Sequence, residues 1–135
     1  MEKRIDPEDM FKSIWEFPDN LNEAFELGSR IKLKNTYTDI SNIVVAGMGG
    51  SAIGGDVLAS LESDKLNIPL IVCRGYTLPN WVSNKTLVIC SSYSGNTEET
   101  LSALDDAINK KAQICGITTG GKIGQKINDL GYDLV

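Results

Sequence analysis

Four short, almost uninterrupted apolar runs constrain the fold of this chain most. The runs are 43–46, 70–73, 86–90 and 114–117, with the sequences IVVA, LIVC, TLVIC and ICGI. Runs of this kind are typical of strands buried on both faces of a parallel sheet. The stretches between them carry apolar residues at helical spacing: Ile53, Val57, Leu58 and Leu61; Leu101, Leu104 and Ile108; and Ile123, Ile127 and Leu130. Strands that alternate with helices predict an α/β domain with a helix-covered sheet.

The expected architecture is a three-layer sandwich around a mostly parallel, five-stranded sheet of the Rossmann-like or flavodoxin-like kind. Residues 132–135 (YDLV) begin a fifth strand and stop in its middle. We therefore expect a longer protein to continue from this point. The predicted division is an N-terminal helical segment, 1–40, packed on the α/β domain, 41–135.

Two helices are predicted within the N-terminal segment. Asp6 offers an N-cap and Pro7 suits the first helical position. The first helix is expected to end at Phe17-Pro18. The second is predicted from the helical spacing of Leu21, Ala24, Phe25, Gly28 and Ile31.

Composition excludes several classes of partner. The 135 residues carry a net charge of −5 with a pI near 4.7, which opposes binding to nucleic acid or acidic membranes, because both attract clustered Lys and Arg. No run approaches the roughly 18 apolar residues of a membrane span, and the N-terminus lacks the apolar core of a signal peptide. The three cysteines lie in or at the end of apolar runs, so a reduced, cytoplasmic setting is expected.

Histidine is absent from the whole sequence. A Ser-His-Asp triad, a His–Cys pair or a histidine metal site cannot be built from this chain alone. Three unclustered cysteines do not replace it. We expect no metal and no cofactor.

The stretch GMGGSAIGGD, from Gly47 to Asp56, stands between the run 43–46 and a predicted helix. In an open α/β sheet, ligands bind beyond the carboxyl ends of the strands. Glycine lets backbone N–H groups approach a ligand, and the helix N-terminus adds free donors and a partial positive charge. The stretch predicts an anion-binding loop that suits phosphate. The alternative is a tight turn that binds nothing.

Two nucleotide-binding motifs fit this stretch poorly. Gly47-x-Gly49-x-x-Ala52 matches the looser dinucleotide fingerprint, but no acidic residue closes the next strand. Gly49 and Gly54 have the spacing of a nucleoside-triphosphate loop, but the lysine that should follow them is missing. A nucleotide ligand is therefore not expected.

A second loop, SSYSGNTEET (91–100), follows the run 86–90. It places hydroxyls around a glycine at the start of a helix: Ser92, Ser94 and Thr97 around Gly95. Hydroxyls and free backbone donors at a helix N-terminus describe an oxyanion cradle, and two such loops on neighbouring strands predict one shared phosphate. In the alternative interpretation, Ser94 or Asn96 only caps the helix, with Glu98 and Glu99 in its first turn.

A third loop, ITTGGK (117–122), closes the next strand. Lys122 could point its charge into the same crevice. It could equally be a solvated side chain in a first helical turn, where a cation is mildly unfavourable. The residues alone do not decide between these roles.

With these three loops in order on successive strand ends, the chain resembles the sugar isomerase (SIS) domain family, whose main signature is Ser-x-Ser-Gly-x-Thr. The first loop, the RGYTLP stretch (74–79) and the continuation SYSGNTEETL are most similar to the N-terminal half of the bifunctional phosphoglucose/phosphomannose isomerases. The resemblance implies a homodimer built from two such domains per polypeptide. It also implies a small-molecule sugar phosphate as ligand.

By this resemblance, two groups of residues hold the phosphate: Gly49, Gly50 and Ser51 in the first loop, and Ser92, Ser94 and Thr97 in the second. Lys122 would be the catalytic cation that stabilises an enediolate, where some relatives carry Arg. A lysine keeps the charge but loses the planar fork. The family moves a proton between C2 and C1 with a glutamate and opens the ring with a histidine. Both residues would come from the missing C-terminal domain.

Glu98 and Glu99 are poor substitutes for that base, because a helix N-terminus favours their charged, weakly basic form. This chain is therefore expected to bind phosphosugar, to be inactive alone, and to serve glycolysis or gluconeogenesis as part of a longer glucose-6-phosphate/mannose-6-phosphate isomerase. Two alternatives stay open: a non-catalytic sugar-phosphate sensor, and a domain acting on amino-sugar phosphates.

Overall fold

The computed structural model describes residues 6–135, and the first five residues of the predicted helical segment lie outside this range. The helices are α1 (Met10–Trp15), α2 (Phe17–Arg30), α3 (Gly49–Leu61), α4 (Glu98–Asn109) and α5 (Gly121–Asp129). The strands are β1 (Asn42–Ala46), β2 (Leu70–Cys73), β3 (Thr86–Ser91), β4 (Gln113–Ile117) and β5 (Asp133–Leu134). The chain divides into two compact units, Met1–Lys32 and Leu33–Val135, which are described separately.

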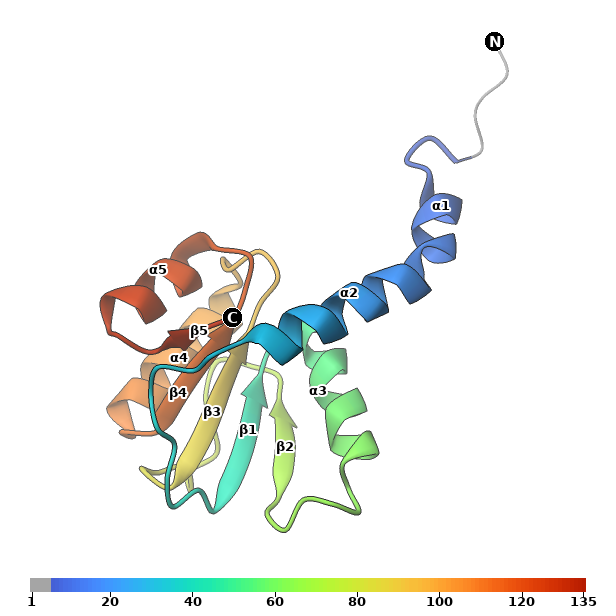
Figure 1. Ribbon diagram of the computed structural model, residues 1–135. Helices are drawn as coiled ribbons and strands as arrows, with labels where there is room; N and C mark the ends of the chain where they lie inside the picture. The colour runs from blue at the N-terminus through green and yellow to red at the C-terminus, as the bar shows by residue number, and fades with distance from the viewer. Residues whose placement is uncertain (1–5) are drawn as a thin grey trace. The chain divides into compact units, whose positions relative to one another are not determined.

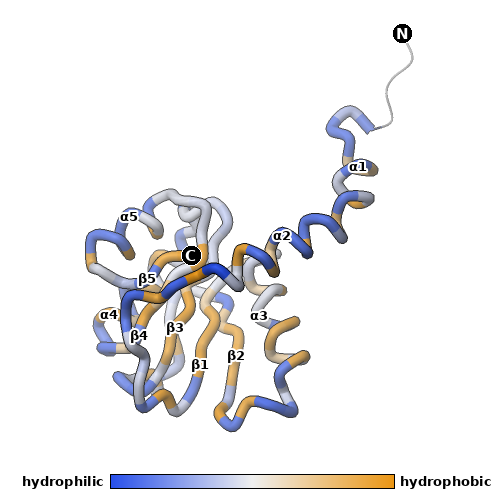
Figure 2. Tube along the Cα trace, viewed as in Figure 1, coloured by the Kyte–Doolittle hydropathy of each residue, from blue (hydrophilic) through white to orange (hydrophobic). Residues whose placement is uncertain are grey.

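All five strands of the second unit form one parallel sheet in the order β2-β1-β3-β4-β5 (Figure 1). The strands lie within one or two residues of the predicted runs, and Figure 2 shows them as the most continuously hydrophobic parts of the unit. The prediction of an α/β fold with a parallel five-stranded sheet is confirmed.

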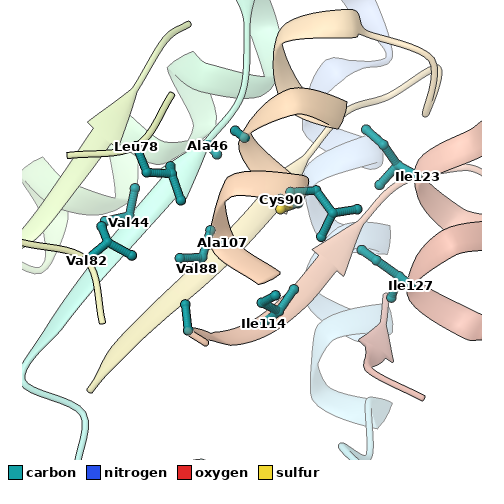
Figure 3. Close-up of a cluster of buried hydrophobic side chains, with 13 residues drawn as sticks. Val44, Ala46, Leu78, Val82, Val88, Cys90, Ala107, Ile114, Ile123 and Ile127 are labelled. Carbon is teal, nitrogen blue, oxygen red and sulfur yellow. The ribbon is translucent and has the colours of Figure 1, made fainter. Parts of the chain in front are cut away.

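The main hydrophobic core lies between the sheet and helices α4 and α5. Val44, Val88 and Ile114 stand side by side on this face, because the register pairs Val44 with Val88 and Val88 with Ile114. Ile123 and Ile127 of α5 are fully buried against the same cluster (Figure 3). The predicted apolar stripes of α4 and α5 therefore do face the sheet, apart from Leu130, which is exposed.

The opposite face of the sheet is covered differently, by α3 over β1 and β2. A Cβ atom added at Gly55 would lie 2.9 Å from Cγ1 of Val45 and 3.0 Å from Cγ2 of Val72, so only glycine permits this close helix–sheet contact. The predicted stripe of α3 is not buried against the sheet, and its four large residues are exposed: Ile53, Val57, Leu58 and Leu61. Small residues lie at the contact instead.

Burial on both faces of every strand was a wrong expectation: β2 has no fully buried residue, β4 alternates in burial, and β3 shows the alternation most clearly. Its residues alternate between buried and half-buried, with Val88 and Cys90 on the α4 side and Leu87, Ile89 and Ser91 on the other. A strand covered by a helix on one face alone gives this alternation.

An extended connection, residues 74–85, joins β2 to β3 without a helix. It adds two side chains, Leu78 and Val82, to the core cluster near Val44 (Figure 3). Asp106 of α4 anchors it by accepting the Leu78 N–H at 2.8 Å. The adjacent Lys110 ammonium, 2.6 Å away, contributes most to holding the pKa of the Asp106 carboxyl below its ordinary value.

The Asp133 carboxylate, on the last strand β5, binds the segment 34–37 that precedes β1. The Asp133 side chain is buried and accepts hydrogen bonds from the backbone N–H groups of Lys34 (2.6 Å) and Asn35 (3.0 Å) and from the Tyr37 hydroxyl (2.8 Å). These donors, the Lys34 N–H above all, lower the pKa of Asp133 to about 2. Burial and the neighbouring carboxylate raise the pKa of Tyr37. We call these four residues the Asp133 clip.

The first unit consists of α1 and α2. Asp6 accepts hydrogen bonds from Met10 and Phe11, but the helix begins at Met10 and its N-cap residue is Asp9, so the prediction of Pro7 at the first helical position was wrong. The break between the helices falls at the predicted place, with Pro18 in the first turn of α2. Packing of this segment on the α/β domain stays a prediction.

Candidate functional site

The first and second loops flank the topological switch point of the sheet. Strands β1 and β3 are neighbours, but β1 leads to α3 on one face and β3 leads to α4 on the other. In open α/β sheets, connections that leave neighbouring strands towards opposite faces create a crevice beyond the carboxyl ends of the strands. This is where ligands bind in open α/β sheets.

Direct contacts join the two loops across this crevice. The Tyr93 N–H donates to Oγ of Ser51 at 3.2 Å. A Cβ atom added at Gly47 would lie 2.9 Å from the Ser91 carbonyl oxygen, so this glycine permits the close approach of the loops. In contrast, nothing lies within 4 Å of the corresponding positions at Gly49 and Gly50. Gly47 is therefore needed for the packing of the two loops, whereas Gly49 and Gly50 leave the surface of the first loop open.

The third loop is fastened to the second. The Ile123 N–H donates to the Gly95 carbonyl at 2.9 Å, the Lys122 N–H donates to Oδ1 of Asn96 at 3.2 Å, and the Thr119 hydroxyl donates to the Tyr93 carbonyl at 2.7 Å. The N-terminus of α5 is therefore engaged by the second loop. Its N–H groups are less open to a ligand than those of α3 and α4.

The hydroxyls of the second loop sit at different depths. Ser94 is exposed and Thr97 is half-buried, whereas Ser92 is only 2% exposed. The Ser92 hydroxyl lies 3.0 Å from Oγ1 of Thr97 and accepts the Gly95 N–H at 3.1 Å. Ser92 therefore supports the loop from within, and Ser94 and Thr97 form more of its surface.

Backbone N–H groups determine whether two of the site's hydroxyls donate or accept hydrogen bonds. Oγ of Ser51 accepts the Tyr93 N–H, and Oγ of Ser94 accepts the Asn96 N–H at 3.2 Å. Each oxygen has one lone pair engaged by an N–H, and its own O–H proton is left to donate elsewhere. Among residues 6–135, neither proton has an acceptor. The crevice thus presents donors, which suit an anion.

Two helix N-termini reinforce this character. The N-cap residues of α3 and α4 are Met48 and Thr97, and within the described part of the chain neither helix start has a side-chain cap. The alternative in which Ser94 or Asn96 caps α4 is therefore wrong, although Glu98 and Glu99 do lie in its first turn. Uncapped first-turn N–H groups and the helix dipoles favour a negative ligand.

Lys122 lies exposed in the first turn of α5, where its backbone N–H is bound by Asn96. No ion pair of its ammonium group is found within residues 6–135. A second cation at the carboxyl edge, Arg74 after β2, is paired with Asp56 of α3. The candidate site therefore contains hydroxyls and N–H groups rather than a cluster of cations.

Two adjoining hollows of about 290 and 320 Å³ open beside the crevice, on the α3 side of the sheet. They share Ser51, Ser91 and Ile117. Sequence reasoning missed one residue here, Tyr93, which lines the smaller hollow and is 80% exposed. Its only sequence signal is an aromatic residue set between two hydroxyl residues of the second loop.

The groups with displaced pKa values belong to the framework. Burial raises the pKa of Cys90 to about 12 and that of Cys115 to about 11. All three cysteines are free. Cys90 is fully buried and behaves as the small hydrophobe that was predicted.

Comparison with known proteins gives a consistent family. No protein-family model matches the chain. A bifunctional phosphoglucose/phosphomannose isomerase of Caldicellulosiruptor bescii is 49% identical over 126 residues, which are 93% of this chain and 37% of that protein. One from Thermoplasma acidophilum is 46% identical over 95 residues, 70% of this chain and 28% of that protein. The chain thus spans well under half the length of these relatives.

Solved structures agree on the fold. Tagatose-6-phosphate ketose/aldose isomerase from Escherichia coli matches with a TM-score of 0.57 over 90% of this chain and 34% of that chain, at 19% identity. The fold is that of sugar isomerase (SIS) domains. The chain is homologous to the bifunctional phosphoglucose/phosphomannose isomerases, and the resemblance to this family is confirmed.

None of the described helices is both long and apolar enough to cross a membrane.

Proposed function

We propose that this chain is the phosphosugar-binding, N-terminal domain of an aldose–ketose isomerase that interconverts glucose 6-phosphate or mannose 6-phosphate with fructose 6-phosphate. The observation that carries the proposal is the pair of helix-starting loops at the switch point, where Ser51 and Ser94 have O–H protons free to donate. The relatives named above supply the substrate class. In this proposal the phosphate lies between the starts of α3 and α4.

The proposed phosphate ligands are Gly49, Gly50, Ser51, Ser92, Ser94 and Thr97. The open surface at Gly49 and Gly50 supports direct contact with their N–H groups. The buried position of Ser92 supports an indirect role, in which it orients the Thr97 hydroxyl. Charge-assisted hydrogen bonds of this kind are stronger than those between neutral groups.

Isomerisation also needs a base that removes a carbon-bound proton and a group that opens the sugar ring. The chain contains no histidine, and its two carboxylates beside the second loop, Glu98 and Glu99, lie in the first turn of α4. We propose that a second domain of the longer protein supplies the catalytic Glu and His. Lys122 is the proposed catalytic cation, and its ammonium is available for this role.

A coupled isomerase assay tests this division of labour. The 135-residue chain is assayed alone and joined to the part of the Caldicellulosiruptor relative that it does not match. We expect the chain alone to be close to inactive, since general acid–base groups contribute about 10²–10⁴-fold each. The joined protein should turn over fructose 6-phosphate, and Lys122→Met should lower its kcat. Comparable turnover by the short chain would place the base within it.

A second candidate is a domain acting on amino-sugar phosphates. A D-glucosamine-6-phosphate 4-epimerase of Sulfolobus acidocaldarius is 38% identical over 99 residues and supports it. Calorimetric titration with glucosamine 6-phosphate and glucose 6-phosphate distinguishes the two by which ligand binds more tightly. If the full-length protein binds sugar phosphate without turnover of either ligand, the non-catalytic sensor is favoured instead.

The remaining expectations belong to the proposed longer enzyme. It would act as a homodimer in glycolysis or gluconeogenesis. Three free cysteines are compatible with a reducing, cytoplasmic compartment.

A further inference from the structure

Tyr93 combines a fixed backbone with a free side chain. Its N–H is bound by the Ser51 hydroxyl at 3.2 Å, and its carbonyl accepts the Thr119 hydroxyl at 2.7 Å. The residue is nevertheless 80% exposed, the highest exposed fraction among the large apolar residues of the described chain. The three loops therefore fix the backbone of Tyr93, while most of the residue's surface is exposed.

Tyr93 lies beside the hollow that adjoins the candidate phosphate site. Ser51 belongs both to the crevice and to this hollow. A ligand whose phosphate reaches Ser51 can therefore place its carbon atoms in this hollow. Tyr93 lines that hollow together with Ile117 and Val135.

The chemistry of the hollow suits the C–H groups of a sugar better than its hydroxyls. The adjoining hollow, which shares Ser51 and Ile117 with it, is lined by three aliphatic side chains, Val45, Leu58 and Ile89. Aromatic rings offer large apolar faces at low cost in conformational entropy, and ligand sites commonly combine them with a few polar groups that fix orientation. The cradle would bind the phosphate, and an aromatic face would cover the carbon skeleton.

We propose that Tyr93 contacts the carbon skeleton of the bound hexose phosphate and sets the preference of this site for sugar phosphate over inorganic phosphate. This inference rests on the proposed function. It assigns to Tyr93 a specificity role that is separate from phosphate binding by the hydroxyls. The variant Tyr93→Ala should therefore affect the two ligands differently.

The experiment measures Kd for glucose 6-phosphate and for inorganic phosphate by calorimetry, using the whole 135-residue chain. Tyr93→Ala should weaken glucose 6-phosphate binding by about 2- to 10-fold, the range expected for one aromatic contact. Its Kd for inorganic phosphate should not change. Tyr93→Phe keeps the ring and should bind like the original chain. Tyr76→Ala is the matched control, because Tyr76 is 52% exposed on another loop and lines neither hollow.

The outcomes separate this inference from the proposed function. If neither ligand binds to the original chain, the proposed function fails and the inference falls with it. If both ligands bind but Tyr93→Ala changes neither Kd, or changes both equally, the proposed function stands and the role of Tyr93 is refuted. A loss of binding in Tyr93→Phe would also refute it, since the hydroxyl and not the ring face would then make the contact.

Discussion

Replacing Gly95 with alanine should destabilise the domain far more than the same change at Gly49. Both glycines have positive φ angles, 65° at Gly95 and 52° at Gly49, so alanine at either position costs about 1–2 kcal/mol of left-handed strain. The surroundings differ. A Cβ atom at Gly95 would lie 1.8 Å from the Gly120 carbonyl oxygen and 2.6 Å from its carbonyl carbon, whereas nothing lies within 4 Å at Gly49.

The clash at Gly95 involves backbone and cannot be relieved by turning a side chain. The second and third loops must separate, which strains the bond from the Ile123 N–H to the Gly95 carbonyl. Overpacking of this kind costs about 1–3 kcal/mol. We therefore expect Gly95→Ala to lower the free energy of unfolding by about 2–5 kcal/mol and Gly49→Ala to lower it by about 1–2 kcal/mol.

Urea unfolding followed by circular dichroism measures both losses, with the slope m checked for constancy. Gly49→Ala serves as the matched control, because it carries the strain without the clash. Equal losses in the two variants would refute the argument that loop–loop contact dictates Gly95. A larger loss at Gly49 would refute it as well.

Three further predictions concern binding and stability. Ser94→Ala should weaken hexose 6-phosphate binding by about 1–3 kcal/mol, as measured by titration calorimetry. The control is Ser63→Ala, in an exposed turn beyond the other end of α3, which should have no effect. Unchanged affinity in Ser94→Ala would remove this hydroxyl from the site. A chelator should leave that binding unaltered, and a loss that zinc or magnesium restores would contradict the expectation of no metal. The carboxyl of Asp133 has its pKa lowered from 3.8 to about 2, so its contribution to stability is present above pH 3.8 and lost as the pH falls towards 2. Asp133→Asn should therefore be less stable than the original chain at neutral pH in urea unfolding and lose less stability between pH 5 and 2; parallel pH profiles would contradict this.

The elements of the fold could be predicted from sequence because each depends on local pattern. Strands β1 to β4 are read from their apolar runs, and the buried faces of α4 and α5 follow from helical spacing. The orientation of α3 could not be read in this way. Its helix is apolar around most of its surface, so periodicity does not distinguish the side that Gly55 brings against Val45 from the side that carries Ile53.

The candidate site was predictable in its location but not in its internal contacts. Hydroxyls and glycines after successive strands place it at the carboxyl edge. The role of each residue depends on contacts between loops that are 25 or more residues apart, such as Lys122 with Asn96 and Tyr93 with Ser51. Sequence spacing carries no information on which hydroxyl is buried, and so Ser92 was not distinguishable from Ser94.

Two backbone amides in the Asp133 clip can report whether the whole α/β unit has folded. The bonds of the clip join Asp133 to Lys34 and Asn35, which are 99 and 98 residues away in the chain. Loops of this length have a high closure entropy, so such contacts become favourable only once the intervening sheet provides the framework. Protection of these two amides from hydrogen exchange would therefore report the arrival of the last strand, and with it the folding of the unit as a whole.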